Sequence, residues 1–307
     1  MPEGSDATRV CGILPLDKPA GPTSHDIVQD VRRATGIRRV GHAGTLDPAA
    51  TGLLVILVGA ATRLARFVTA ADKEYVADIT FGTETDTCDA EGETVARAPV
   101  PRELTDPGHA AGIVTSLVGE HSQVPPSYAA VKRGGEKAYE AARAGRPIEL
   151  EARPCVVASA ELEHVDPGPP VTWRVRTTVS KGTYVRAIAR DLGRSLGTVA
   201  HLSALRRTRS GRIAIGQASS VSDVRDAGSE GLEGLCIPAL EAVALPVVEL
   251  SSTQETDVGH GKPLPRNTAE IDDGALVSLA AGSRLLAVYA AEASRLAPEV
   301  VLSGGCP

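Results

Sequence analysis

Apolar and polar residues repeat along this chain with spacings that predict both strands and helices. A continuous apolar run over Leu53–Val58 predicts a buried element. Alternation over Lys73–Gly82 and over Trp173–Val179 predicts two half-buried strands. Helices are predicted where apolar residues recur at helical spacing, after a cap at residues 21–26, over 59–67, 101–118 and 135–145, and after Thr183. The chain is therefore expected to contain both strands and helices.

The same patterning divides the chain into regions. Residues 1–10 lack apolar periodicity and are expected to be flexible, and Gly12–Pro19 predicts a short strand broken by proline. The main domain is expected to span 11–218, followed by a helical linker over 219–244. From 245 to 307, short strands separated by glycine and proline turns predict a small β-barrel-like domain.

The stretch from Gly41 to Gly59 combines glycines, one carboxylate and a proline ahead of the apolar run. Glycine permits positive φ and the close approach of a ligand. Pro48 disfavours the α conformation for Asp47, so this carboxylate is expected on an irregular loop that the buried run holds rigidly. Such a carboxylate suits catalysis. The alternative is that Asp47 merely caps the following helix.

Composition narrows the class of protein. The chain has 307 residues with 42% apolar and 23% charged residues, as in soluble globular proteins. No apolar run approaches a membrane span, and the first residues lack a signal-peptide pattern, so a cytoplasmic location without membrane association is expected. The five widely spread cysteines indicate neither a disulfide framework nor a zinc site, and buried or incidental thiols are expected.

Charge is distributed unevenly along the chain. The net charge is −6, but residues 121–212 carry 16 Lys/Arg against 8 Asp/Glu, whereas residues 213–307 carry 5 against 13. A basic region of this kind is compatible with a polyanionic partner, because affinity follows the local charge. Acidic residues 83–92 do not have the spacing of a calcium-binding loop, and the sequence therefore predicts no metal site there.

The segment at 44–48, Gly-Thr-Leu-Asp-Pro, closely resembles the catalytic motif of the bacterial tRNA pseudouridine synthases that act on uridine 55 of the T loop, the TruB family. Further motifs of that family follow in the same order between about residues 12 and 215: Leu-Asp-Lys-Pro at 16–19, Lys-Glu-Tyr at 73–75, Thr-x-Thr-x-Asp-x-x-Gly at 85–92, Pro-Pro at 125–126, Tyr-x-Arg at 184–186 and Leu-x-Arg at 205–207. This chain departs from the pattern at Ala129, where the family has serine, and in its acidic tail.

The resemblance implies a set of site residues. Asp47 corresponds to the nucleophile, Tyr75 to the tyrosine that stacks on the target base, and Arg186 to the arginine that pairs with the catalytic aspartate. An arginine near a helix N-terminus gains nothing from the helix dipole, which independently suggests a carboxylate partner, although a surface arginine is the alternative. The remaining substrate-binding residues are predicted to be His42, Gly44, Tyr184, Leu205, Lys18, Arg206 and Arg207. For Lys18, the alternative interpretation is a surface lysine without a role in binding.

The resemblance also implies a fold and a reaction. The fold would be of the α+β class, with a central mixed, mostly antiparallel sheet flanked by helices and a small β-rich (PUA-like) C-terminal domain. The reaction would isomerise uridine 55 to pseudouridine after base flipping, without cofactor or metal, on a tRNA T stem-loop, in a monomer without an obligate protein partner. Asp47 could attack C1′ or C6 or abstract a ribose proton to form a glycal. The competing hypotheses are a non-catalytic RNA-binding or tRNA-folding protein and a synthase with another RNA target.

Overall fold

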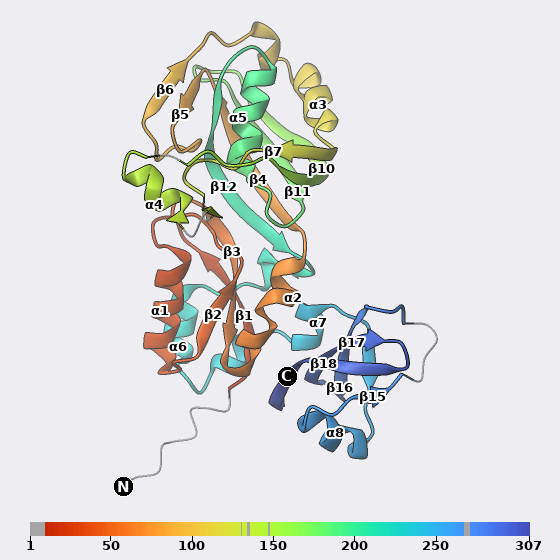
Figure 1. Cartoon of the computed structure of the whole chain (residues 1–307). Helices are drawn as coiled ribbons and strands as arrows, with labels where there is room; N and C mark the ends of the chain where they lie inside the picture. Colours follow the sequence, from red (N-terminus) through yellow and green to blue (C-terminus); the bar gives the residue numbers. More distant parts are fainter. Residues whose placement is uncertain (1–9, 130, 134–135, 147, 267–270) are drawn as a thin grey trace. The chain divides into compact units, whose positions relative to one another are not determined.

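The computed structural model describes residues 10–129, 131–133, 136–146, 148–266 and 271–307. The chain divides into two compact units, the first formed by residues 1–71 together with 209–307, and the second by residues 72–208. The predicted flexible start at residues 1–10 lies outside the described residues except for Val10. The predicted domain boundaries at 218 and 245 remain predictions. Figure 1 shows the course of the chain and its element labels.

In the first unit, the apolar run predicted to be buried forms a strand that pairs with two other strands. Strand β3 (Thr51–Val58) pairs antiparallel with β1 (Gly12–Lys18) and with β2 (Val40–Ala43), and its residues from Leu53 to Val58 are fully buried. The predicted break at Pro15 is wrong, because the strand continues through it with Pro15 opposite Val55. The elements around this sheet are α1 (Ser24–Thr35), η1 (Gly59–Leu64), α2 (Ala65–Ala70), β13 (Ile213–Ala214), η3 (Ile215–Gln217), α6 (Val221–Ala227), η4 (Leu232–Leu235) and α7 (Ala239–Val243).

The end of the chain adds a second, five-stranded sheet to the first unit. Its order is β14-β16-β17-β18-β15, with β14 (Val247–Glu249), β15 (Leu264–Pro265), β16 (Leu276–Ala281), β17 (Arg284–Glu292) and β18 (Arg295–Cys306). Helix α8 (Ser252–Gly259), which the pattern did not predict, packs against β17 and β18. One hydrophobic core contains side chains from β1, β3, α7, β17 and β18, so the C-terminal strands share a core with the N-terminal sheet.

A disulfide joins the two ends of the described chain. Cys11, just before β1, is bonded to Cys306, the last residue of β18, with their Cα atoms 5.2 Å apart. The sequence prediction of incidental thiols is wrong for this pair. The reason is that spacing along the chain carries no information about residues that the fold brings together from its two ends. Cys88, Cys155 and Cys236 are free, as expected.

The second unit is built on a longer sheet with the strand order β12-β4-β11-β10-β7. These strands are β4 (Lys73–Phe81), β7 (Gly119–Gln123), β10 (Arg153–Asp166), β11 (Thr172–Val179) and β12 (Ala200–Ser210). The pairs β4–β11, β11–β10 and β10–β7 are antiparallel. Its core contains Phe81 and Trp173, whose rings meet edge to face with centroids 4.7 Å apart, and apolar residues of α3 (Pro107–Ser116) and α5 (Val185–Ser195).

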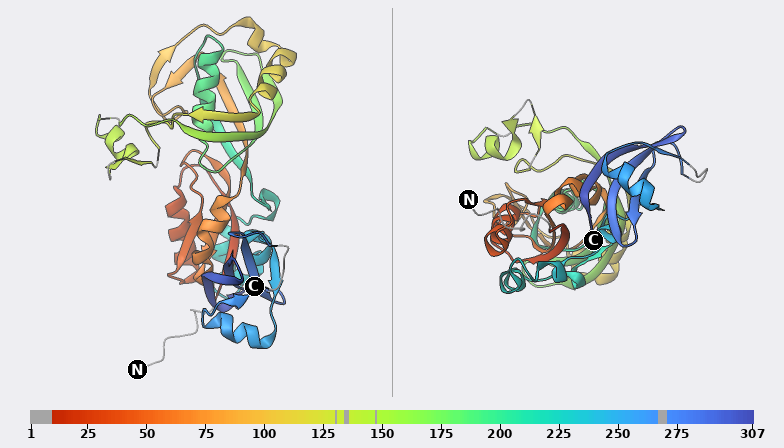
Figure 2. Two further views of the ribbon diagram at one scale, coloured as in Figure 1. Left: turned by 45° about the vertical axis from the view of Figure 1, so that its right-hand side comes forward. Right: turned by 90° about the horizontal axis from the view of Figure 1, so that it is seen from below.

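Shorter elements complete the second unit. They are β5 (Thr83–Thr85), β6 (Thr94–Arg97), η2 (Arg102–Thr105), β8 (Lys132–Arg133), β9 (Glu136–Lys137) and α4 (Ala138–Arg143). The segment with β8, β9 and α4 projects from the sheet in both views of Figure 2. The helix predicted over 101–118 is divided into η2 and the shorter α3, because Pro107 starts a new helix that Asp106 caps.

The N-cap of helix α5 lies one residue later in the chain than predicted. Its N-cap is Tyr184 rather than Thr183, and no side chain of the cap residue accepts a hydrogen bond there. The hydroxyl of Thr183 instead lies 3.2 Å from the hydroxyl of Ser180, in the turn before the helix. No helix among the described residues is long and apolar enough to cross a membrane.

Candidate active site

Asp47 lies on the irregular loop that the sequence predicted, between β2 and β3. The loop begins at Gly44, whose φ of 92° favours glycine. On one side of Asp47, the backbone of Leu46 is fixed by the hydroxyl of Ser24, which accepts from its N–H at 2.9 Å and donates to its carbonyl at 3.0 Å. On the other side, the Pro48 carbonyl accepts from the N–H of Gly21 at 2.9 Å. Asp47 is therefore half-buried and held from both sides.

Lys18 is a structural part of this loop. The residue is fully buried, so the surface-lysine alternative is wrong. Its ammonium donates to the carbonyls of Pro19, Pro22 and Pro48 at 2.9, 2.8 and 3.0 Å. A lysine ammonium has three N–H donors, and these three carbonyls come from two separate turns. Lys18 thus links the end of β1 to the residue that follows Asp47, while its predicted contact with a phosphate remains a prediction.

Tyr75 and Leu205 lie on neighbouring strands of the second unit. Tyr75 is on β4, opposite Thr177 of β11, and Leu205 is on β12, which pairs with β4. Both side chains are partly buried and pack against the same core. An aromatic ring and an aliphatic side chain on one apolar surface are suited to holding a planar base. Tyr184 packs instead against the apolar residues of the projecting segment around α4.

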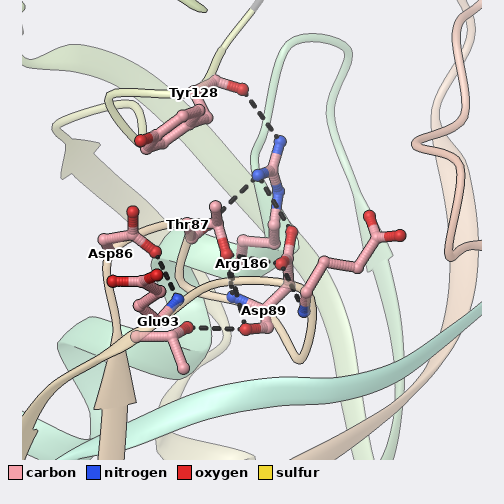
Figure 3. Close-up of polar contacts among 8 residues, drawn as sticks. Asp86, Thr87, Asp89, Glu93, Tyr128 and Arg186 are labelled. Atoms are coloured by element: carbon pink, nitrogen blue, oxygen red, sulfur yellow. Dashed lines mark hydrogen bonds and ion pairs between the residues drawn. The ribbon is translucent and has the colours of Figure 1, made fainter. Parts of the chain in front are cut away.

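Arg186 is buried in the first turn of α5, so the surface-arginine alternative is wrong. Its Nη1 lies 3.1 Å from Oδ2 of Asp89 and donates to the carbonyl of Thr87 at 3.1 Å, and its Nη2 donates to the carbonyl of Tyr128 at 3.3 Å (Figure 3). Arg186 thus has a carboxylate partner, as expected, and Asp89 is one such partner. The ion pair between Arg186 and Asp47, which lie in different units, remains a prediction.

Asp89 is itself held by hydrogen bonds within its own acidic loop, residues 83–92. Its Oδ1 accepts from the Thr87 hydroxyl at 2.5 Å and from the Glu91 N–H at 3.1 Å. The hydroxyl of Thr85 donates to its carbonyl at 2.6 Å. Cys88 between them has a φ of 61°, and burial raises the pKa of its thiol. The signal for Asp89 was present in the Thr-x-Thr-x-Asp spacing, but only the fold shows that it faces Arg186.

The predicted phosphate contacts differ in accessibility. Arg206 is half-buried, whereas the side chain of Arg207 is almost fully buried on β12. Lys73 at the start of β4 is also buried, and burial, followed by the charge of Arg207, lowers the pKa of its ammonium to about 8. Arg206 is therefore the better candidate for contacting RNA. The RNA contact of Arg207 remains a prediction.

The predicted catalytic groups are the carboxylate of Asp47, the phenol of Tyr75 and the guanidinium of Arg186. His42, Gly44, Asp47 and Lys18 belong to the first unit, and the other predicted site residues belong to the second. Within the residues that the structure describes, no group of three or more His, Cys, Asp or Glu side chains could hold a metal ion. Asp47 offers a nucleophile or base on a fixed loop, and Arg186 offers a buried positive charge with a defined orientation.

Two family models match adjacent parts of the chain. Residues 32–185 match the model described as TruB family pseudouridylate synthase (N terminal domain). Residues 186–250 match the model described as tRNA pseudouridylate synthase B C-terminal domain. Together they include nearly all the predicted site residues, from His42 to Arg207.

Several proteins named tRNA pseudouridine synthase B are similar in sequence to this chain over most of its length. A Thermobifida fusca protein named tRNA pseudouridine synthase B is 42% identical over 300 residues, which is 95% of this chain and 99% of that protein. A Thermus thermophilus protein of the same name is 42% identical over 280 residues, 81% of this chain and 86% of that protein. The crystal structure of a Cbf5-Nop10-Gar1 complex contains a chain that is 27% identical, with a TM-score of 0.74, covering 95% of this chain and 84% of that one. The predicted α+β fold with a β-rich C-terminal part is thereby confirmed.

Proposed function

Because this chain belongs to the TruB family of pseudouridylate synthases, we propose that it converts uridine 55 in the T loop of tRNA to pseudouridine. The observation that carries this proposal is the similarity to proteins named tRNA pseudouridine synthase B, which extends over 95% of the chain at 42% identity. The loop of Asp47 and the buried setting of Arg186 support it, since both fix a reactive group in place.

The proposed reaction is an isomerisation within one nucleotide. The bond between N1 of uracil and C1′ of ribose breaks, the uracil turns, and C5 forms a new bond to the same C1′ before it loses its proton. Asp47 initiates these steps by attack on C1′, by attack on C6, or by removing a ribose proton to give a glycal. Arg186 keeps Asp47 in its charged form, because a nearby positive charge favours a carboxylate.

The target base has to leave the RNA stack to reach these groups. Tyr75 stacks on the extruded uracil and takes the proton from C5 at the end, and Leu205 supports the base from the same apolar surface. Tyr184 lines the pocket, and His42 fills the space that the flipped nucleotide leaves. Lys18 and Gly44 shape the loop of Asp47, and Arg206 contacts the RNA backbone.

Replacement of Asp47 tests the chemistry. Asp47→Asn preserves the size of the side chain but removes its charge, so pseudouridine formation should become undetectable while tRNA binding stays within a few fold. The measurement is mass-spectrometric mapping of pseudouridine in an unmodified tRNA transcript after incubation with each protein. Asp86→Asn, a substitution in the acidic loop, is the matched control. Product formation by Asp47→Asn at the wild-type rate would refute the assignment of Asp47 as nucleophile.

The same assay separates the competing functions. Conversion at the T-loop uridine alone supports the proposed target, and conversion elsewhere would retain the chemistry and replace the target. Tight tRNA binding without conversion by the wild type would favour an RNA-binding or tRNA-folding protein. The Cbf5 protein is named in a complex with Nop10 and Gar1. We propose that this chain acts as a monomer without such partners, which activity of the purified chain alone would support.

A further inference from the structure

Gln123 joins the end of an edge strand to the start of the helix that carries Arg186. Its side chain is buried at the last position of β7. Its Oε1 accepts from the backbone N–H of Tyr184 at 2.9 Å, and its Nε2 donates to the carbonyl of the same residue at 3.1 Å. One amide group therefore satisfies both backbone groups of a single residue, much as a neighbouring strand would.

The bonded residue occupies a position that otherwise lacks a cap. Tyr184 is the N-cap of α5, and its own side chain makes no capping hydrogen bond. The first N–H groups of a helix have no partner within the helix and need one from elsewhere. Gln123 fixes the cap residue from outside the helix, two positions before Arg186.

Two further contacts tie the segment after β7 to the same helix. Nη2 of Arg190 donates to the carbonyl of Val124 at 2.9 Å, and Nη2 of Arg186 donates to the carbonyl of Tyr128 at 3.3 Å. The segment from Gln123 to Tyr128 is thus attached to α5 at its cap, in its first turn and one turn further on. These contacts pair side chains with backbone groups across two elements far apart in sequence.

A half-open cavity borders Gln123 near α5. Its volume is about 300 Å³, and its lining includes Gln123 of β7, Cys155 of β10, and Ile188 and Leu192 of α5. Side chains that border such a space lose the contacts that would otherwise fix their positions. The polar contacts of Gln123 and Arg190 therefore contribute to the alignment of the helix at this end.

We propose that Gln123 is a positioning residue that aligns Tyr184 and Arg186 for the reaction. It acts through the backbone of Tyr184 and does not touch the reacting atoms. The inference rests on the proposed function in so far as Arg186 serves pseudouridine formation. Loss of the two hydrogen bonds lets the first turn of α5 shift into the cavity, which displaces the guanidinium of Arg186 from its place.

Gln123→Met tests the proposal, because methionine has a similar length and cannot form either hydrogen bond. Single-turnover pseudouridine formation should fall roughly tenfold to a hundredfold, as a displacement of about 1 Å at a catalytic group produces. The Kd for tRNA should stay within a few fold. Ser122→Ala, next on the same strand and exposed, should match the wild type. A rate for Gln123→Met within twofold of the wild type would overturn the proposal.

Gln123→Glu distinguishes a specific hydrogen-bonding role from general damage. When ionised, the introduced carboxylate can accept from the Tyr184 N–H but has no donor for its carbonyl. When protonated, it can do both, as the amide does. The neighbouring charged or titratable groups are His121 on β7, Arg153 and Cys155 on β10, and Arg190 and Asp191 on α5. The rate relative to the wild type should therefore be higher at pH 5.5 than at pH 8, and a relative rate that rises with pH would contradict the role.

Hydrogen exchange keeps the outcome separate from that of the proposed function. In Gln123→Met, the amides at the start of α5 should exchange at least tenfold faster than in the wild type, whereas those of β11 should not change. If the wild type forms no pseudouridine, the proposed function fails and the exchange measurement still decides whether Gln123 holds the helix. Unchanged exchange at residues 184–188 would show that Gln123 does not hold the start of α5 in place.

Discussion

Several lysine and arginine residues of this protein are buried rather than exposed to solvent. Lys18, Lys73 and Arg207 are all buried. Counting charges along the sequence treats such residues as candidates for RNA contact, because burial cannot be seen in composition. Lys18 illustrates the difference, since its three carbonyl partners come from turns that the sequence does not show to be adjacent. Within residues 121–212, Arg186, Arg190 and Arg207 are buried. The basic surface available to RNA is therefore smaller than the count of 16 cations over that range suggests.

Lys73 predicts a specific dependence of stability on pH. Burial is the main reason that the pKa of its ammonium falls from 10.5 to about 8. Between these values the unfolded chain binds more protons than the folded protein, so the free energy of unfolding rises with pH. Below pH 8 the charged ammonium costs up to roughly 3 kcal/mol, and this cost disappears as the pH approaches 10.5.

Urea unfolding of the wild type and of Lys73→Met at pH 7 and pH 10 measures this effect. The variant has no ammonium to bury, so its stability should exceed that of the wild type by more at pH 7 than at pH 10. Other titrating groups contribute equally to both proteins and cancel in the comparison. Equal differences at the two pH values would show that Lys73 does not titrate in this window.

At the scale of secondary-structure elements, the sequence predicted local structure well but not the contact between Asp89 and Arg186. Local periodicity predicted β4 and β11 nearly residue by residue, because each has an alternating pattern. It predicted that the apolar run of β3 is buried, without assigning it to a strand. The glycine, aspartate and proline of the Asp47 loop were equally informative. The ion pair of Arg186 with Asp89 could not be derived in this way, because 97 residues separate the two partners.

Removal of the Asp89 charge should reduce catalysis through Arg186. In Asp89→Asn, the buried guanidinium loses the charge of one of its partners, and loss of one member of a buried pair costs up to about 3–5 kcal/mol. Pseudouridine formation should fall at least about tenfold, since a 1.4 kcal/mol loss in the transition state suffices for that. Glu91→Gln, an exposed change in the same loop, is the control for single-turnover rates and for tRNA binding. An unchanged rate for Asp89→Asn would show that Arg186 keeps its place without this carboxylate.

At the scale of the whole molecule, the C-terminal strands pack in the same unit as the N-terminal strands. The first unit contains both ends of the chain, and the second consists of the residues between them. Side chains near Cys11 and side chains of β18 meet in one core. The sequence pattern placed a separate domain after residue 245 because strands and turns follow one another there, and pattern alone does not show which earlier strands they pack against.

The disulfide between Cys11 and Cys306 should strengthen this closure measurably. It spans 295 residues, and cross-linking so long a segment restricts the unfolded chain, which in the chain-entropy model stabilises the fold by about 5 kcal/mol. Both cysteines lie in the shared core, where the reduced thiols can remain packed, so reduction is not expected to open the fold. Reduction should therefore lower the free energy of unfolding by about 2–5 kcal/mol.

Chemical unfolding with and without a reductant tests this expectation. Cys306→Ser should show the lower stability under both conditions, while Cys236→Ser, which removes a free cysteine of the same unit, should respond to reductant as the wild type does. Mass spectrometry of the unreduced protein should find the peptide of Cys11 linked to that of Cys306. Wild-type stability that is independent of reductant would show that the shared core alone joins the two ends of the chain.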